Sequence, residues 1–219
     1  MLSDKQVKTM LSLQAKMNSK VDPNWVQARY PYLRAVVIEG AEAIEHHGWK
    51  WWKKQAHDLA QLQMELVDIW HFILSEILLK HEGNQDEAQL EVLRLISQIE
   101  GQENISFDGK TYALPEMDLL SKLELLIGLS AARRIDLTTF SSVMESCDLS
   151  WTELFCQYVG KNVLNFFRQD NGYKQGSYQK VWNGREDNEY LVEIMAGLDP
   201  QAIDFQTELY EALASSYPN

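Results

Sequence analysis

Cysteine is scarce in this chain, which holds only Cys147 and Cys156 among its 219 residues. Two cysteines form neither a disulfide framework nor a zinc-binding pattern. Long apolar runs are missing as well, because four polar side chains interrupt the most hydrophobic stretch, 66–79, so no transmembrane span is expected. Residues 1–18 have the pattern of an amphipathic helix rather than of a basic stretch followed by an apolar one, so no amino-terminal signal is expected. These absences predict a cytoplasmic protein.

Positive charge is limited too, with 20 lysines and arginines against 32 aspartates and glutamates and a net charge of −12. A surface this acidic disfavours broad electrostatic binding to nucleic acid or to an anionic membrane. A small anionic substrate remains compatible with the composition, provided that a metal ion and local cations receive it.

Strand signals are few, and no alternating apolar and polar runs joined by Asn-Gly or Asp-Gly turns stand out. Apolar residues at i, i+3 and i+4 dominate instead, so the expected fold class is all-α. The length and the 45% hydrophobic content suit a single domain. Its helical bundle core is expected at about 1–80 and 119–168, and a smaller region of helix and loop, about 83–118 and 170–219, could act as a mobile lid. The predicted helices span 4–18, 32–47, 58–81, 87–99, 119–134, 150–168 and 189–195, with another after Pro200.

Two pairs of acidic residues, each spaced three apart, lie on two of these predicted helices: Glu39 with Glu42, and Glu65 with Asp68. Residues three apart share a helix face, so two packed helices would bring all four carboxylates together. Most acid pairs form solvated faces, but apolar residues surround both of these pairs. Four carboxylates without a cation would repel one another and resist desolvation. Magnesium removes that cost because it takes carboxylate and phosphate oxygens as ligands, so the pattern predicts a magnesium site.

A polar stripe follows the predicted helix that ends at Arg168, where Tyr158, Lys161 and Asn165 precede it at helical spacing. The segment 158–188 holds more cations than acids, and they are Lys161, Arg168, Lys174, Lys180 and Arg185. A local surplus of positive charge in an acidic protein indicates an anion-binding site, and cations aimed at phosphate oxygens stabilise charge that develops during phosphoryl transfer. A solvated helix face followed by a basic loop is the alternative.

Three tryptophans and three lysines are interspersed over residues 49–54, between the two acid-bearing helices. The rings could be core anchors, or they could bracket a nucleotide base while the lysines meet phosphate. Gln14 and Asn18 lie one turn apart on the first predicted helix. Their amides could read the edge of a base, although polar helix-surface residues are the commoner explanation.

Taken together, these motifs resemble the dimeric, all-α dUTPase family, which belongs to a wider group of helical NTP pyrophosphohydrolases with the MazG-like and dCTPase enzymes. The resemblance covers most of 1–80 and 119–195 in the same order. The segments that carry it are 13–18, 39–42, 49–53, 65–72, 158–165, 168–174 and 182–188. It implies a homodimer that hydrolyses dUTP, and dUDP as well, to dUMP, with release of pyrophosphate from dUTP, and that uses Mg²⁺ with two or more ions in each site.

The resemblance also assigns roles to single residues. The expected metal ligands are Glu39, Glu42, Glu65 and Asp68, and Glu39 is the expected group that orients or deprotonates the attacking water. The expected contacts to sugar and phosphates are Lys50, Lys53, Tyr158, Lys161, Asn165, Arg168, Lys174 and Lys180. The expected base pocket holds Gln14, Asn18 and Trp49, while His71 is either a substrate contact or a histidine at the edge of the core.

Two other functions stay open from the sequence. One is a related pyrophosphohydrolase that acts on dCTP or on several nucleotides, and the other is a helical scaffold dimer without activity. A di-iron bundle fits poorly, because it usually shows Glu-x-x-His pairs whereas the residues at i+3 here are Glu42 and Asp68.

Overall fold

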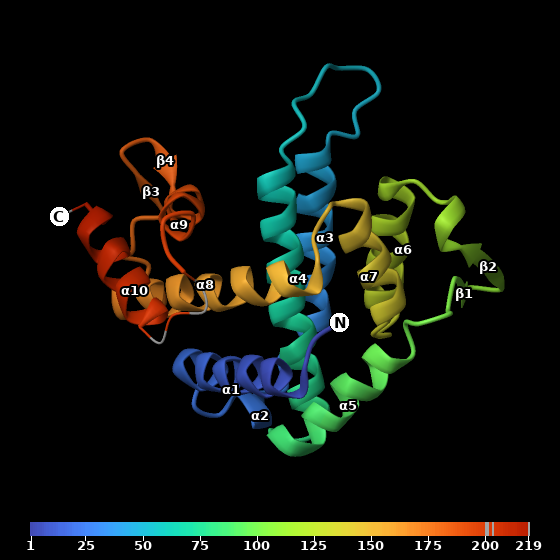
Figure 1. The fold of residues 1–219 in the computed structure, drawn as a ribbon, viewed down its shortest axis with the longest axis horizontal. Helices are drawn as coiled ribbons and strands as arrows, with labels where there is room; N and C mark the ends of the chain where they lie inside the picture. Colours follow the sequence, from blue (N-terminus) through green and yellow to red (C-terminus); the bar gives the residue numbers. More distant parts are fainter. Residues whose placement is uncertain (200–201, 203, 219) are drawn as a thin grey trace.

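The chain folds into helices that are joined by loops and two small hairpins, which confirms the all-α class (Figure 1). The structure is a computed structural model that describes residues 1–199, 202 and 204–218. The longer helices are α1 (Asp4–Val21), α3 (Tyr32–His47), α4 (Leu59–Lys80), α5 (Gln85–Ser97), α6 (Leu119–Ala131), α7 (Leu137–Ser146), α8 (Trp151–Asp170), α9 (Asp187–Met195) and α10 (Phe205–Ser216). The shorter elements are α2 (Trp25–Ala28), the 3-10 turn η1 (Leu114–Glu116), and the strands β1 (Asn104–Phe107), β2 (Lys110–Ala113), β3 (Val181–Trp182) and β4 (Arg185–Glu186).

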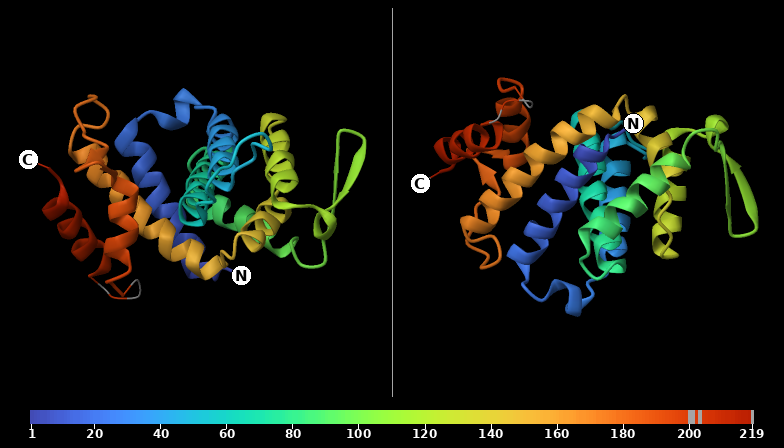
Figure 2. Two further views of the ribbon diagram at one scale, coloured as in Figure 1. Left: turned by 90° about the horizontal axis from the view of Figure 1, so that it is seen from above. Right: turned by 60° about the horizontal axis from the view of Figure 1, so that its bottom comes forward.

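Helix α4 is the centre of the core. It is apolar around most of its circumference, and Asp58 caps it by accepting a hydrogen bond from the Gln61 backbone N–H. Helix α3 runs beside it, and α1, α5 and α8 also pack against it. The views in Figure 2 agree that α1 and α8 lie side by side across this pair. Because α3 and α4 carry the acid pairs, the acids stand on the best-packed part of the molecule.

Helices α1 and α8 begin at capping boxes. Ser3 with Gln6 and Ser150 with Glu153 each satisfy two backbone N–H groups that a helix start leaves without partners. Such caps fix where each helix begins and therefore which side chains face inward. On α8 the inward set includes three members of the polar stripe predicted from the sequence: Tyr158 reaches α1, Lys161 reaches α4 and Arg168 reaches α9.

Helix α6 covers the other side of α3, and the two backbones approach closely at Gly40. A Cβ atom built on Gly40 would lie 2.7 Å from Ile127 Cγ1 of α6, a separation that real contacts do not show. Glycine at this position therefore permits the close packing of α3 on α6, one residue away from Glu39.

The structure corrects the expectation about turns. Strands β1 and β2 form a hairpin around Asp108-Gly109, and β3 and β4 form another around Asn183-Gly184. Each of these four turn residues has a positive φ, which Asp-Gly and Asn-Gly turns favour. The strands are too short for alternation to stand out in the sequence. The lack of alternating runs therefore did not exclude hairpins.

Two helices were not predicted from the sequence. Helix α7 starts at Asp136, whose side chain caps it by accepting from the Thr139 N–H, and its apolar residues face the core. The four-residue α2 follows the Asp22-Pro23-Asn24 break. The segment 171–186, for which the sequence predicts no helix, is loop apart from the β3–β4 hairpin.

The middle segment divides between two clusters. Ala88, Val92 and Ile96 of α5 belong to the main core, whereas the β1–β2 hairpin packs with Leu125 and Leu129 of α6 in a smaller cluster. A lid motion of this segment stays a prediction. Pro200 lies outside the described residues, and the helix expected after it is α10. None of the described helices has the length and hydropathy of a membrane span.

Candidate active site

The acid pairs meet between α3 and α4. Carboxylate oxygens of Glu39, Glu42 and Glu65 all lie within 4.8 Å of one another. Asp68 lines the same cavity, where its Oδ2 lies 2.8 Å from the ammonium of Lys161. Hard oxygen donors at this spacing fit a divalent cation such as magnesium. The arrangement follows from two i, i+3 pairs on neighbouring helices, as the spacing predicted.

Burial and mutual repulsion disfavour the charged form of these carboxylates. Burial raises the pKa of Glu39 to about 7, and the nearby charges of Asp68 and Glu42 push it in the same direction. Burial likewise raises the pKa of Glu65 to about 8, again with a contribution from Asp68. Such groups hold protons near neutral pH unless a cation replaces those protons. The electrostatics therefore fit a site that is built to receive positive charge.

A polar cavity of about 940 Å³ opens over the acids. Cationic side chains line the same cavity, and they are Lys161, Arg168, Lys180 and Arg185. Carboxylates and cations that line one cavity would together suit an anion accompanied by divalent cations.

Arg168 is held rigidly in that cavity. Its Nε and Nη2 atoms each lie 2.8 Å from a carboxylate oxygen of Asp187, and its Nη2 also donates to Asn188. Burial alone would raise the pKa of Asp187, but the hydrogen bond and charge of Arg168 hold it below its ordinary value. A second donor, the hydroxyl of Tyr178, reaches the same carboxylate at 2.8 Å. The guanidinium is thus oriented before any ligand enters.

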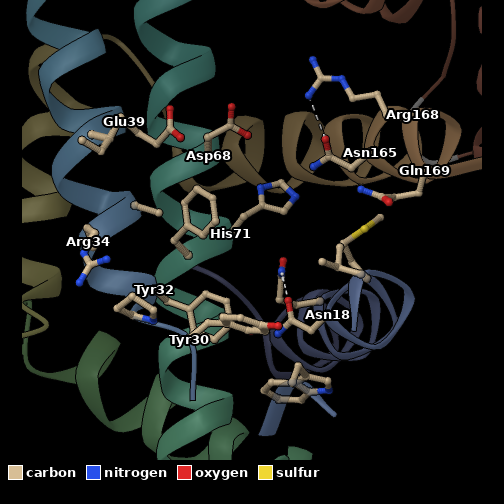
Figure 3. Close-up of a pocket in the computed structure, with 18 of the residues that line it drawn as sticks. Asn18, Tyr30, Tyr32, Arg34, Glu39, Asp68, His71, Asn165, Arg168 and Gln169 are labelled. Atoms are coloured by element: carbon tan, nitrogen blue, oxygen red, sulfur yellow. Dashed lines mark hydrogen bonds between the residues drawn. The ribbon is translucent and has the colours of Figure 1, made fainter. Parts of the chain in front are cut away.

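A second, mainly apolar cavity of about 590 Å³ adjoins the first. The two share four lining residues, which are Glu39, Asp68, Arg168 and Tyr173. Figure 3 shows Glu39 and Asp68 on one side, Asn165 and Arg168 of α8 on the other, and Asn18 with Tyr30 and Tyr32 at the opposite end. The combined space suits a molecule with a flat ring at one end and several negative charges at the other.

A chain of hydrogen bonds fixes the polar end of the apolar cavity. The Tyr158 hydroxyl lies 2.8 Å from Gln14 Oε1 and 3.0 Å from the Met10 carbonyl. Gln14 Nε2 donates to Asn18 Oδ1 at 3.0 Å, and Ser75 donates to the same oxygen at 3.2 Å. Because both donors occupy its oxygen, Asn18 has only its Nδ2 donor left, and this atom is buried without a partner in the described residues.

His71 supplies the complementary group. Its Nδ1 lies 2.8 Å from the Val67 carbonyl, which can only accept, so Nδ1 carries the proton. Burial lowers the pKa of His71 to about 4, so the ring is neutral and its Nε2 is an acceptor. Within the described part of the chain this buried nitrogen also has no partner. Asn18 and His71 both line the apolar cavity, and each keeps one buried polar atom without a partner in the described residues, a donor on Asn18 and an acceptor on His71.

Most residues singled out in the sequence gather around the two cavities. The apolar cavity holds Gln14, Asn18, His71 and Asn165, and the polar one holds Lys161 and Lys180 together with all four acids. Arg168 lies where the two cavities meet.

Five other candidates line neither cavity: Trp49, Lys50, Lys53, Tyr158 and Lys174. Trp49 and Lys50 lie in the loop between α3 and α4, at the top of Figure 1, and both donate to the carboxylate of Glu45 on α3. Tyr158 is fully buried behind Gln14, and Lys174 donates to the Val21 carbonyl at the end of α1. Tyr158 therefore lies behind the wall of the apolar cavity, and Trp49 lies outside both cavities of its own chain, so their contacts to substrate stay predictions.

The sequence reasoning missed several lining residues. Tyr30, Tyr32 and Phe72 supply the aromatic wall, and Tyr173 stands where the cavities meet. No spacing rule marks such aromatics, because a ring in a pocket and a ring in the core look alike in a sequence. Asp187, which orients Arg168, lies in one of the segments that carried the family resemblance, and this was the available signal.

Comparison with known proteins agrees with this geometry. A family model described as dUTPase matches residues 6–173, which include both acid-bearing helices and the polar stripe of α8. Comparison with curated proteins found no significant match. Because the family model matches most of the chain, the protein belongs to the all-α dUTPase family and is a dUTP diphosphatase.

Proposed function

We propose that this dUTPase converts dUTP, and also dUDP, to dUMP with the help of two or more Mg²⁺ ions held by Glu39, Glu42, Glu65 and Asp68. The observation that carries the proposal is the convergence of three carboxylates, with ligand oxygens within 4.8 Å of one another, in a polar cavity that adjoins an apolar one. Such ions would make bound water more acidic and neutralise charge on the polyphosphate.

The chain's own residues then have distinct tasks. Glu39 touches both cavities, and a pKa of about 7 before metal binds suits a group that orients water and accepts its proton. Arg168, which Asp187 holds in place, faces the space where phosphate oxygens would lie. Pyrophosphate is the second product when dUTP is the substrate.

Uracil selection is proposed to come from Asn18 and His71. Uracil presents an N3–H donor between two carbonyl acceptors, which complements the His71 Nε2 acceptor and the Asn18 Nδ2 donor. Cytosine presents a lone pair at N3 and an amino group at C4. It would therefore set acceptor against acceptor and donor against donor. Leaving a buried polar group unpaired costs about 1–3 kcal/mol, so this mismatch disfavours dCTP.

We propose further that the enzyme is a homodimer. Trp51 and Trp52 are 86% and 59% exposed in the loop between α3 and α4. Tyr30 and Ile38, at the mouth of the apolar cavity, are 43% and 53% exposed. Exposed apolar surface of this extent favours a second copy of the chain as a partner. Sedimentation of the wild type and of a Trp51→Ser, Trp52→Ser variant tests this, and a monomeric wild type at micromolar concentration would contradict it.

The test of the activity is phosphate-product release across all four dNTPs and dUDP, with magnesium and with EDTA. We expect dUTP to be turned over fastest, and only with the metal. Equal turnover in EDTA would contradict the metal site, and faster turnover of dCTP would contradict the uracil assignment.

A further inference from the structure

Lys161 is the most deeply buried cation in the polar cavity. Only 1% of it is exposed, yet its Nζ lies 2.8 Å from Asp68 Oδ2 and 2.9 Å from Asn188 Oδ1. A buried ammonium is costly to desolvate, so it persists only where it is paired and hydrogen-bonded. Asp68 and Asn188 supply that pairing, and the ammonium stands directly against one of the four acids at the junction of α4 and α8.

The other cations of this cavity are paired differently. Arg168 binds Asp187, Lys180 lies 3.2 Å from Glu186, and Arg185 binds Glu189 and Glu193. All of these acids lie in the segment 186–193, outside the acid quartet. Among the lysines and arginines that line this cavity, Lys161 is therefore the one that forms an ion pair with a proposed metal ligand.

The quartet is divided as a result. Glu39, Glu42 and Glu65 form one compact cluster, and in the described residues no lysine or arginine pairs with them, although His46 lies 3.3 Å from Glu65. Asp68 is outside that compact cluster and is tied to Lys161. Three acids are thus available to a cation at once, while the fourth has to give up a partner first.

We propose that Lys161 is a built-in counter-ion for Asp68 that couples metal binding to nucleotide binding. Before ligands enter, its ammonium neutralises Asp68. When the nucleotide binds, the ammonium turns to a phosphate oxygen and releases Asp68 to a divalent cation. This inference rests on the proposed magnesium-dependent function and goes beyond it, because it states an order in which ligands become available.

The exchange has a thermodynamic consequence. If the nucleotide must take Lys161 before Asp68 is free, the nucleotide strengthens metal binding, and by linkage the metal strengthens nucleotide binding by the same factor. Couplings of this kind are typically about 5- to 150-fold. Replacing Lys161 by an uncharged side chain should release Asp68 in advance, so that metal binds more tightly without nucleotide and the coupling shrinks.

Calorimetric titration tests this without any measurement of activity. Mg²⁺ is titrated into the full-length enzyme, alone and with a dUTP analogue whose α,β-bridging oxygen is replaced by NH, for the wild type and for Lys161→Met. We expect the analogue to tighten Mg²⁺ binding at least about fivefold in the wild type and much less in the variant, whose affinity without the analogue is higher. Lys122→Met is the matched control, because this ammonium is also buried but donates to Ser146 and lines neither cavity, and it should keep the wild-type coupling.

A second variant guards against loss of the fold. Lys161→Gln keeps a donor for Asp68 and Asn188 but removes the charge, and its folding is checked by thermal melts in EDTA and in Mg²⁺. Unchanged Mg²⁺ affinity and coupling in whichever variant folds would overturn the role of Lys161 and leave the proposed function intact. Absence of Mg²⁺ binding to the wild type, with and without the analogue, would overturn both.

Discussion

Tyr158→Phe is a sharp test of how the enzyme reads a base, because the altered atom touches no substrate. The Tyr158 hydroxyl is buried behind the cavity wall and reaches Gln14 Oε1 at 2.8 Å. It is the first link of the chain that leaves Asn18 with its Nδ2 donor free. Without the hydroxyl, the bond from Ser75 to Asn18 is the remaining contact in the described part of this chain that orients the two amides. We expect it to be too weak alone, so that the Gln14 amide reverses and Asn18 turns with it.

The expected size of the effect follows from the buried amide. Leaving Gln14 Oε1 unpaired costs about 1–3 kcal/mol, and in a chain of this length each kcal/mol lowers the melting temperature by about 2–4 °C. If the amides turn to recover that energy, Asn18 presents its oxygen to the cavity and accepts from the amino group of cytosine. A change of 1.4 kcal/mol is tenfold in selectivity, so the kcat/KM ratio of dUTP over dCTP should fall by about tenfold or more.

The assay is steady-state kinetics with both nucleotides, together with a thermal melt. Tyr178→Phe is the matched control, since its hydroxyl binds Asp187 in the C-terminal part of the chain. It should lower stability and affect both substrates alike. A Tyr158→Phe enzyme that melts early yet keeps the wild-type ratio would refute the idea that this hydroxyl sets the direction of the amides.

Three further outcomes are expected. Glu42→Gln should abolish turnover while circular dichroism and melting in EDTA stay near the wild type, and normal turnover would count against the metal site. In EDTA the melting temperature should fall as the pH rises from 6.5 to 8. Glu39 and Glu65, with pKa values raised from 4.5 to about 7 and about 8, bind more protons in the folded state than in the unfolded state over this range. The pKa of His71 is lowered from 6.5, so its titration affects stability below this range, and a rise in melting temperature would contradict the scheme. Asp187→Asn leaves a buried guanidinium unpaired and should cost about 3–5 kcal/mol in urea unfolding, and a loss below about 1 kcal/mol would mean that the pair is not effectively buried.

Helical period predicted most of the fold. The acid pairs could be placed from their i, i+3 spacing and their apolar neighbours, because two such helices have few ways to pack. Helix α7 was missed, since its apolar residues are interspersed with serines and threonines that also suit a loop. The hairpins were missed because two or four residues are too few to display a strand's alternation.

The candidate site was predicted unevenly, for a physical reason. Charged residues such as Lys161 and Arg168 are easy to single out, because a charged side chain among the apolar positions of a helix is buried only when it is paired. Which side chain touches a ligand and which supports it depends on depth, and depth is not encoded in spacing. Tyr158 shares a helix face with Asn165, but only Asn165 reaches the cavity. The position of Trp49 depends on how an eleven-residue connection between α3 and α4 is arranged, which no local pattern fixes.

Gly40 links α6 to the position of Glu39, although no residue of α6 lines either cavity. Since the backbone beside Glu39 rests on Ile127 with no side chain between them, a larger side chain at position 127 should displace α3 and with it Glu39, the proposed proton acceptor. Trimming Ile127 would open the space that an alanine at position 40 lacks, so the two sites should tolerate change together more readily than apart. Variation far from the nucleotide, on the outer helix, thereby becomes a means of adjusting the reaction centre.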